Sequence, residues 1–201
     1  MKELTTKKFN FQSINGLSEK QLDAHFNLYK GYVTKVNEIS KLSKNPQDFK
    51  GSNPTFSEMR SQKLGETYAL NGVKLHELYF ENICDAKGEP SEELNKLITG
   101  CFKDKDEMIA YLKEVALSVR GWAIVALDCL TESLRVIGAD LHDYGAVWGA
   151  TPIIVIDVYE HAYFMDYGSD RGAYLDKILN NLNWDVINER VKKETAKWSN
   201  I

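Results

Sequence analysis

Residues 152–164 read PIIVIDVYEHAYF, in which an apolar run leads directly into a carboxylate and, four residues later, an imidazole. A short apolar run of this kind predicts a buried β-strand, so Asp157 is expected where the strand leaves the core and His161 in the segment that follows. This spacing alone is weak evidence of a site, because a hydrogen bond on a surface helix produces it too. The chain has only four histidines, however, and the surroundings of the others decide what the pair means.

Two long amphipathic helices are predicted before this stretch, and each carries one histidine on its apolar face. Ser18 and Gln21 form a capping-box start, after which apolar residues recur at helical spacing around His25. A second helix is predicted after the polar breaker stretch SKNPQDFKGSNP, residues 43–54, and its apolar face includes His76. Two long helices joined by a short polar loop form an antiparallel hairpin.

The rest of the chain is predicted to form a second domain that contains a small sheet. The segment DAKGEPS, residues 85–91, has the composition of a linker, so we expect two domains, 1–88 and 89–201. Two short helices are expected next and two more at the end. Between them lie three apolar runs that are predicted strands, at residues 122–127, 134–137 and 152–156.

The composition excludes several classes of protein. The chain is 43% hydrophobic without a run of eighteen apolar residues, which predicts a globular protein with no membrane span. Its first residues, MKELTTKKFNF, lack the apolar segment of a secretory signal, so we expect a cytoplasmic protein. A formal net charge of -4 argues against nucleic-acid binding. Three widely spaced cysteines, Cys84, Cys101 and Cys129, argue against a disulfide framework and predict buried, reduced thiols.

Three of the four histidines, with one carboxylate, predict a metal site. His25 and His76 lie on the buried faces of two helices that pack together, while Asp157 and His161 come from the end of a strand. A single histidine on an apolar face is more often a core residue with one hydrogen bond. Several ionisable groups buried together are costly unless an ion binds them. Three imidazoles and one carboxylate suit Fe, Mn or Zn, so ligand type leaves the metal open.

Several segments resemble motifs of one known family. The run DVYEHAYF resembles the DVWEHAYY signature of the iron/manganese superoxide dismutases, and NLNWDVINERV resembles the final helix of that family. LSEKQLDAHFNLYKGYVTKVN, LHELYFENI and RGWAIVAL resemble its first-helix, second-helix and first-strand motifs. The resemblance covers nearly the whole chain in the same order. It implies an α+β fold, in which an antiparallel helical hairpin precedes an α/β domain with a three-stranded antiparallel sheet and the metal lies between the two.

The resemblance also implies an activity and a set of ligands. One Fe or Mn ion per subunit would be held by His25, His76, Asp157 and His161, and redox cycling of that ion would convert superoxide to dioxygen and hydrogen peroxide. Glu160 matches the family glutamate that bonds across a subunit interface to the ligand histidine of the other subunit. We therefore expect a homodimer, or a tetramer built from dimers.

Further roles follow from the resemblance at single positions. Tyr32 corresponds to the gateway tyrosine that holds the active-site water network. The residue that hydrogen-bonds the metal-bound solvent is a glutamine in most members, and iron-type members place it where this chain has Gly72. Manganese-type members place it in the loop after the second strand, where this chain has His142, so the resemblance makes His142 the candidate donor; histidine there resembles members that use iron or either metal. Lys30 and Arg171 are candidates for steering the anionic substrate.

Some positions depart from the family pattern. Tyr29 replaces a family histidine and Phe164 a family tyrosine, a pair that normally bonds across the subunit interface, so the usual access gate is in doubt. Two aromatics near the metal are altered to Phe80 and Tyr159, and the Tyr159 hydroxyl needs a partner. Trp122 is retained.

Two other functions remain open at this stage. A zinc hydrolase would use three histidines to bind zinc and activate water, with Glu160 as the nearby general base. A non-catalytic relative would keep the fold as a metal-binding or interaction protein, and the altered gate favours that alternative.

Overall fold

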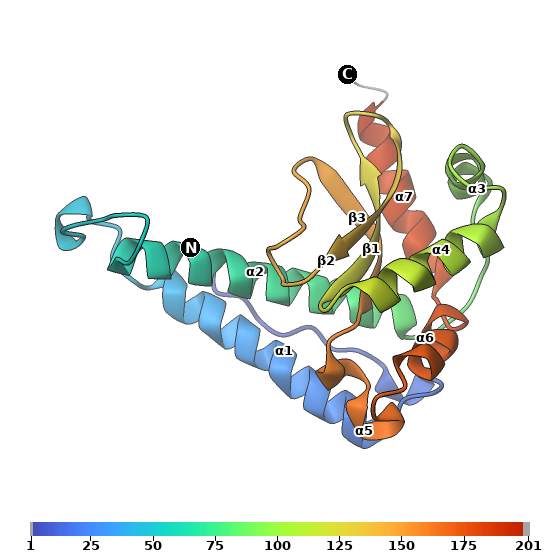
Figure 1. The fold of residues 1–201 in the computed structure, drawn as a ribbon, viewed down its shortest axis with the longest axis horizontal. Coiled ribbons are helices and arrows are strands. Elements are labelled where there is room, and N and C mark those ends of the chain that lie inside the picture. Colours follow the sequence, from blue (N-terminus) through green and yellow to red (C-terminus); the bar gives the residue numbers. More distant parts are fainter. Residues whose placement is uncertain (1, 199–201) are drawn as a thin grey trace.

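The computed structural model describes residues 2–198 of the 201-residue chain. A helical hairpin is followed by two short helices, a three-stranded sheet and further helices, so the predicted α+β fold is confirmed (Figure 1). The longer elements are α1 (Glu19–Ser40), α2 (Glu58–Ile83), α3 (Glu92–Thr99), α4 (Lys105–Ser118), β1 (Trp122–Asp128), β2 (Ser133–Ala139), β3 (Ala150–Asp157), α6 (Arg171–Leu179) and α7 (Trp184–Trp198). The short ones are η1 (Phe11–Ser13), η2 (Pro46–Asp48), η3 (Glu160–Ala162) and α5 (Phe164–Tyr167).

Side chains that accept hydrogen bonds from the first turn begin several of these helices. Ser18 caps α1, as predicted, and Ser57 caps α2. Ser91 and Asp104 do the same for α3 and α4, and Asn183 accepts from the first turn of α7. Such caps satisfy backbone N–H groups that have no partner within the helix. The helix starts are therefore specified by residues close in sequence and do not depend on tertiary contacts.

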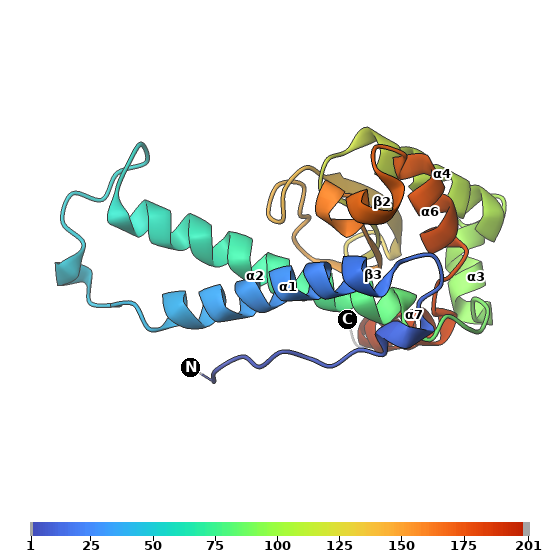
Figure 2. The same ribbon diagram turned by 90° about the horizontal axis from the view of Figure 1, so that it is seen from below.

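The predicted helical hairpin is formed by α1 and α2, which pack against each other along their apolar faces. Leu22, Tyr29 and Val33 are buried on α1, and Val73 and His76 are buried on α2. The tip of the hairpin extends beyond the rest of the molecule, as both ribbon views show (Figures 1 and 2). One hydrophobic cluster continues from the hairpin into the sheet, and the division of the chain after residue 88 stays a prediction.

The three predicted strands form one antiparallel sheet in the order β2-β1-β3. Helix α4 contacts β1 and β2, while α2 and α7 contact β3, so the central strand β1 is buried along its whole length. Burial on both faces explains why β1 and most of β3 read as continuous apolar runs rather than as an alternating pattern. The register places Trp122 opposite Asp157, which brings the start of β1 and the end of β3 to the same edge of the molecule.

Arg190 of α7 joins the hairpin to the sheet. A bulge in β3 takes Ile153 out of the regular ladder, and the carbonyl of Ile153 accepts from the Arg190 guanidinium at 2.8 Å. The same guanidinium donates to the Leu78 carbonyl (3.0 Å), the Asn82 side chain (2.5 Å) and the Glu81 carboxylate (2.8 Å). One largely buried cation therefore links the two halves of the protein through four acceptors.

Replacing Arg190 by Met is expected to lower the free energy of unfolding by about 3 kcal/mol, because it leaves buried acceptors without donors. Chemical denaturation followed by circular dichroism measures the change. Arg60→Met is the matched control, since Arg60 is exposed on α2, and it should stay within about 0.5 kcal/mol of the wild type. Equal losses in the two variants would contradict the role given to Arg190.

The cysteines are free thiols, as predicted, but the prediction that all three are buried was wrong. Cys84 is buried at the end of α2, Cys101 is exposed in the turn after α3, and Cys129 is partly exposed in the turn between β1 and β2. Both errors arise at chain turns, where backbone leaves the core. Within residues 2–198, no helix combines the length and the hydropathy needed to cross a membrane.

Candidate metal centre

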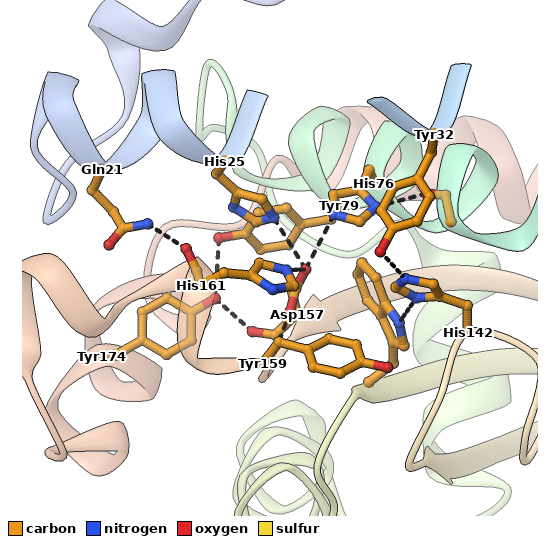
Figure 3. A network of polar contacts seen from close by, with 12 residues as sticks. Gln21, His25, Tyr32, His76, Tyr79, His142, Asp157, Tyr159, His161 and Tyr174 are labelled. Atoms are coloured by element: carbon orange, nitrogen blue, oxygen red, sulfur yellow. Dashed lines mark hydrogen bonds and ion pairs between the residues drawn. The ribbon is translucent and has the colours of Figure 1, made fainter. Parts of the chain in front are cut away.

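Four segments of the chain bring the four predicted ligands together between the hairpin and the sheet (Figure 3). His25 lies on α1, His76 on α2, Asp157 at the end of β3 and His161 in η3. The Nε2 atoms of His25, His161 and His76 lie 3.1, 3.3 and 3.7 Å from Asp157 Oδ2. These side chains differ in depth: His25, His76 and Asp157 have no exposed side-chain surface, whereas the His161 side chain is 31% exposed.

The spacing of these donor atoms fits a metal ion. Ligand atoms about 2.0–2.2 Å from one ion lie about 3.0–3.6 Å from each other, and the distances to Asp157 Oδ2 fall close to that range. Three imidazoles and one carboxylate are also a donor set that Fe, Mn and Zn accept. The residues present therefore fit the ion that the sequence predicts.

His76 provides a second sign of an ion. Its Nδ1 donates to the Gly72 carbonyl at 2.6 Å, so the neutral ring carries its proton there and its Nε2 has a free lone pair. That Nε2 is buried and has no hydrogen-bond donor among the described residues. A buried acceptor without a partner is unfavourable, and an ion at Nε2 would satisfy it. His25 Nδ1 is also buried without a partner in residues 2–198, and an ion at Nε2 of that ring would leave it so.

The carboxylate is oriented by the end of β3. The backbone N–H of Tyr159 donates to Asp157 Oδ1 at 3.0 Å, which leaves Oδ2 facing the three imidazoles. Burial acts to raise the pKa of Asp157, but the charge and hydrogen bond of His161 and the hydrogen bond of His25 outweigh it and hold the pKa well below its usual range. Asp157 is therefore an anion inside the protein, as a metal ligand must be.

The buried imidazoles are neutral for a related reason. Burial lowers the pKa of His25, and burial together with the nearby His25 ring lowers the pKa of His76 to about 3. Removing a charged ring from water is unfavourable, so both rings stay unprotonated at neutral pH. Neutral imidazole is the form that binds a metal ion.

Beside the ligand cluster, His142 connects Trp122 with Tyr32. The indole Nε1 of Trp122 can only donate, and it does so to His142 Nδ1 at 2.9 Å. Burial lowers the pKa of His142 to about 4, so the ring is neutral and its single proton lies on Nε2. That Nε2 is 2.7 Å from the Tyr32 hydroxyl oxygen and therefore donates to it. The one N–H of His142 thus points at Tyr32, and the Tyr32 hydroxyl keeps its own proton for another acceptor (Figure 3).

The structure explains why this chain has glycine at position 72. A Cβ atom at Gly72 would lie 2.9 Å from both Cδ1 and Cγ of Tyr32. Because Cγ is the ring atom nearest the backbone, rotation of the ring cannot relieve the contact. Any side chain at this position would displace Tyr32, so a glutamine from α2 and the observed position of Tyr32 exclude each other.

Replacing Gly72 by Ala is expected to break the Tyr32–His142 hydrogen bond and to lower any activity that depends on Tyr32 about tenfold, the lower end of what such supporting contacts contribute. Gly65→Ala on the same helix is the control, because its Cβ would meet only one atom, Ile39 Cδ1, at an ordinary 3.7 Å. That variant should keep full activity and gain up to about 1 kcal/mol of stability from helix propensity. Unchanged activity in both variants would show that the position of Tyr32 is unimportant.

The departures from the family pattern have structural counterparts. Tyr29 has no exposed surface: its hydroxyl donates to Glu77 (2.9 Å) and accepts from the Lys7 N–H (2.9 Å), and burial raises its pKa to about 12. Phe164, in contrast, is 52% exposed on α5. The Tyr159 hydroxyl finds a partner in the Asp140 carbonyl at 3.3 Å. The Tyr29 hydroxyl therefore bonds to Glu77 and to Lys7 of the N-terminal segment. Tyr29 is buried and Phe164 is exposed, so the two do not share a surface.

The remaining predicted residues are placed as follows. Lys30 is exposed, with its ammonium group 5.3 Å from the centre of the Phe26 ring. Arg171 donates to the carbonyls of Ala116 and Val119 and to the Tyr163 hydroxyl, so its guanidinium fastens α6 to the end of α4. Glu160 is exposed next to His161. The steering role of Lys30 and Arg171 stays a prediction. The hydrogen bonds of Arg171 also give it a structural role.

Two side chains near the site escaped the sequence analysis as functional residues. Tyr68 of α2 packs on His142 with ring centres 4.4 Å apart, and Gln21 of α1 contacts the backbone of His161. A signal was present for each, because Tyr68 lies eight residues before His76 and Gln21 four residues before His25, on the same helical faces.

The fold and the site define a class: a metalloprotein in which a helical hairpin and an α/β domain enclose three imidazoles and one carboxylate. The family model of the iron/manganese superoxide dismutase C-terminal domain matches residues 90–190. A protein named iron superoxide dismutase from Aquifex aeolicus (strain VF5) is 44% identical over 186 residues, which cover 90% of this chain and 87% of the relative.

More distant relatives carry the names of other metals. A manganese/iron superoxide dismutase from Aeropyrum pernix is 29% identical over 86% of this chain and 89% of its own length. A manganese superoxide dismutase from Halobacterium salinarum is 35% identical over 66% of each chain. The chain belongs to the iron/manganese superoxide dismutase family, which confirms the resemblance seen in the sequence.

Proposed function

We propose that this protein disproportionates superoxide with one redox-active Fe or Mn ion per chain, bound by His25, His76, Asp157 and His161. The observation that carries the proposal is the gathering of three imidazole nitrogens around Asp157 Oδ2, with the buried His76 Nε2 left unsatisfied. A bound Fe or Mn ion supplies one-electron redox chemistry, by which two superoxide ions and two protons become dioxygen and hydrogen peroxide.

The chain's own residues supply what surrounds that chemistry. The anionic Asp157 offsets the positive charge of an ion in a place from which water is excluded. The backbone N–H of Tyr159 fixes the carboxylate, and the Gly72 carbonyl fixes the tautomer of His76, so that both present a lone pair to the same point. Hydrogen bonds within the protein therefore orient both ligands toward the place of the ion.

The reaction consumes protons, and Tyr32 is the group best placed to handle them. Its hydroxyl accepts from His142 and keeps its own proton for donation, with the Tyr68 side chain as a neighbouring hydrogen-bond partner, and its side chain is partly exposed. Burial raises the pKa of Tyr32 above its usual value, so the hydroxyl is protonated at neutral pH. In this proposal His142 acts through Tyr32: it orients the hydroxyl, and Trp122 in turn orients His142.

We further infer that two chains associate through the face that carries His161. Glu160 is exposed there, the His161 side chain is 31% exposed, and Phe164 and Met165 are each 52% exposed on α5. Two half-exposed apolar side chains beside a carboxylate and an imidazole suit a symmetric interface, in which the carboxylate of one chain can meet the imidazole of the other. Sedimentation of the purified protein tests this directly.

Metal analysis combined with a superoxide-consumption assay tests the proposed function. Protein prepared separately with Fe, Mn and Zn should bind one ion per chain, and the Fe form, the Mn form or both should consume superoxide. Stoichiometric Zn without dismutation by either other form would favour the zinc hydrolase. Bound Fe or Mn without turnover would favour the non-catalytic relative. The buried Tyr29, which replaces a family gate residue, is the feature that favours this alternative.

A further inference from the structure

The segment that carries His161 is broken into two short helical pieces, η3 and α5. In a continuous helix the N–H of Met165 would donate to the carbonyl of His161, four residues earlier. Here the side-chain amide of Gln21 stands between these two groups. Its Nε2 donates to the His161 carbonyl at 2.6 Å, and its Oε1 accepts from the Met165 N–H at 3.1 Å. One amide from α1 therefore bridges the break directly beside a predicted ligand. Figure 3 shows its contact with the His161 carbonyl.

Gln21 is fixed on the helix that carries another ligand. It is 1% exposed and lies one turn before His25, so the two side chains lie on the same face of α1. Its backbone N–H bonds to the Ser18 cap at 3.1 Å, but the Ser18 N–H bonds to Asp166 at 2.6 Å instead of to Gln21. Only half of the predicted capping box forms, which leaves the Gln21 amide for the backbone of His161.

The chemistry of the amide explains why this residue type stands here. The break exposes one acceptor and one donor, and a primary amide satisfies both at once. An apolar side chain of the same length would remove the partner of both groups, whereas asparagine carries the same amide but is one methylene shorter. The position therefore requires both the amide and the length of glutamine.

We propose that Gln21 is a positioning residue for His161, which sets where that imidazole lies relative to His25 and so sets the affinity of the metal centre. The proposal rests on the proposed metal site. Gln21 touches the main chain of the ligand rather than its ring, so its effect passes through the place and direction of the His161 side chain. Residues that orient metal ligands in this way commonly contribute 10-fold to 100-fold in affinity.

A variant series separates positioning from plain stability. Gln21→Met keeps the length and removes both hydrogen bonds, while Gln21→Asn keeps the amide and shortens it. Ser18→Ala is the matched control, because it removes the cap of the same helix turn and leaves the Gln21 amide in place. For each protein, chelator competition gives the Fe and Mn dissociation constants, the visible spectrum of the metal-loaded form reports ligand geometry, and the melting temperature of the metal-free form reports stability.

Both Gln21 variants are expected to bind metal between about 10-fold and 100-fold more weakly than wild type and to show a shifted visible spectrum. Ser18→Ala should keep the wild-type spectrum and an affinity within about twofold, even where its metal-free form melts as low as theirs. Wild-type affinity and spectrum in Gln21→Met, or in Gln21→Asn should the Met variant not fold, would overturn the positioning role alone. A wild-type protein that binds neither Fe nor Mn would overturn the metal centre and this role with it.

Discussion

His76→Ala is expected to abolish metal binding under ordinary assay conditions, and superoxide dismutation with it. The Nε2 of this ring is buried, unprotonated and without a donor among the described residues, so it has no use in the structure other than as a ligand. Four-ligand sites bind with about 10–16 kcal/mol, so losing one ligand should remove roughly 3–4 kcal/mol, several hundredfold in affinity. Metal content after dialysis against a weak chelator measures the loss.

The control for His76→Ala is Tyr79→Phe, three residues along the same helix. Tyr79 is also fully buried and packs against His25, but its hydroxyl bonds to Tyr174 at 3.0 Å and lies outside the ligand cluster. This variant should lose some stability and keep its metal. Full activity and metal content in His76→Ala would refute the ligand set.

The second large effect is expected for Asp157→Asn, which should weaken both metal binding and the metal-free fold. The amide retains an oxygen for the Tyr159 N–H, but it removes the negative charge, so metal affinity should fall at least a hundredfold. In the metal-free protein the new NH₂ group would replace Oδ2, which lies 3.1 Å from His25 Nε2 and 3.3 Å from His161 Nε2, contacts that hold the pKa of Asp157 well below its usual range. Losing them should cost about 2 kcal/mol, or about 4–8 °C in the melting temperature.

Calorimetry of metal-free wild type and Asp157→Asn checks the stability half of this prediction, and chelator competition checks the other half. A metal-free variant that melts at or above wild type would mean that the carboxylate does not stabilise the fold by itself. Asp157 would then serve metal binding alone, at the expense of the metal-free fold.

Most of the fold could be predicted because its signals are local. The Ser18 cap and the apolar faces around His25 and His76 depend on residues close in sequence, and both helices are found where expected. The strand prediction 152–156 fell inside β3 but missed its ends, since Ala150 and Asp157 join the ladder only through their partners on β1. The bulge at Ile153 has no local signal either, because the Arg190 that fills it lies on a distant helix.

The site was predicted less evenly. Sequence spacing paired Asp157 with His161, and the buried helix faces added His25 and His76, but the distances among the four follow from how the hairpin packs on the sheet. Hydrogen bonds between residues far apart in sequence could not be predicted. The Tyr29 hydroxyl accepts from the Lys7 N–H, and the Gln21 side chain, predicted for a capping box, bonds at a helix break 140 residues away. Such roles depend on which unsatisfied groups the tertiary structure leaves nearby.

Anomalous X-ray diffraction shows whether four named side chains hold a redox metal. Crystals of the Fe-loaded and Mn-loaded protein are used, with data collected at each metal's absorption edge. One strong peak per chain is predicted, about 2 Å from Nε2 of His25, His76 and His161 and from Oδ2 of Asp157. A peak at any other place, or loaded crystals without a peak between these four residues, would contradict the account.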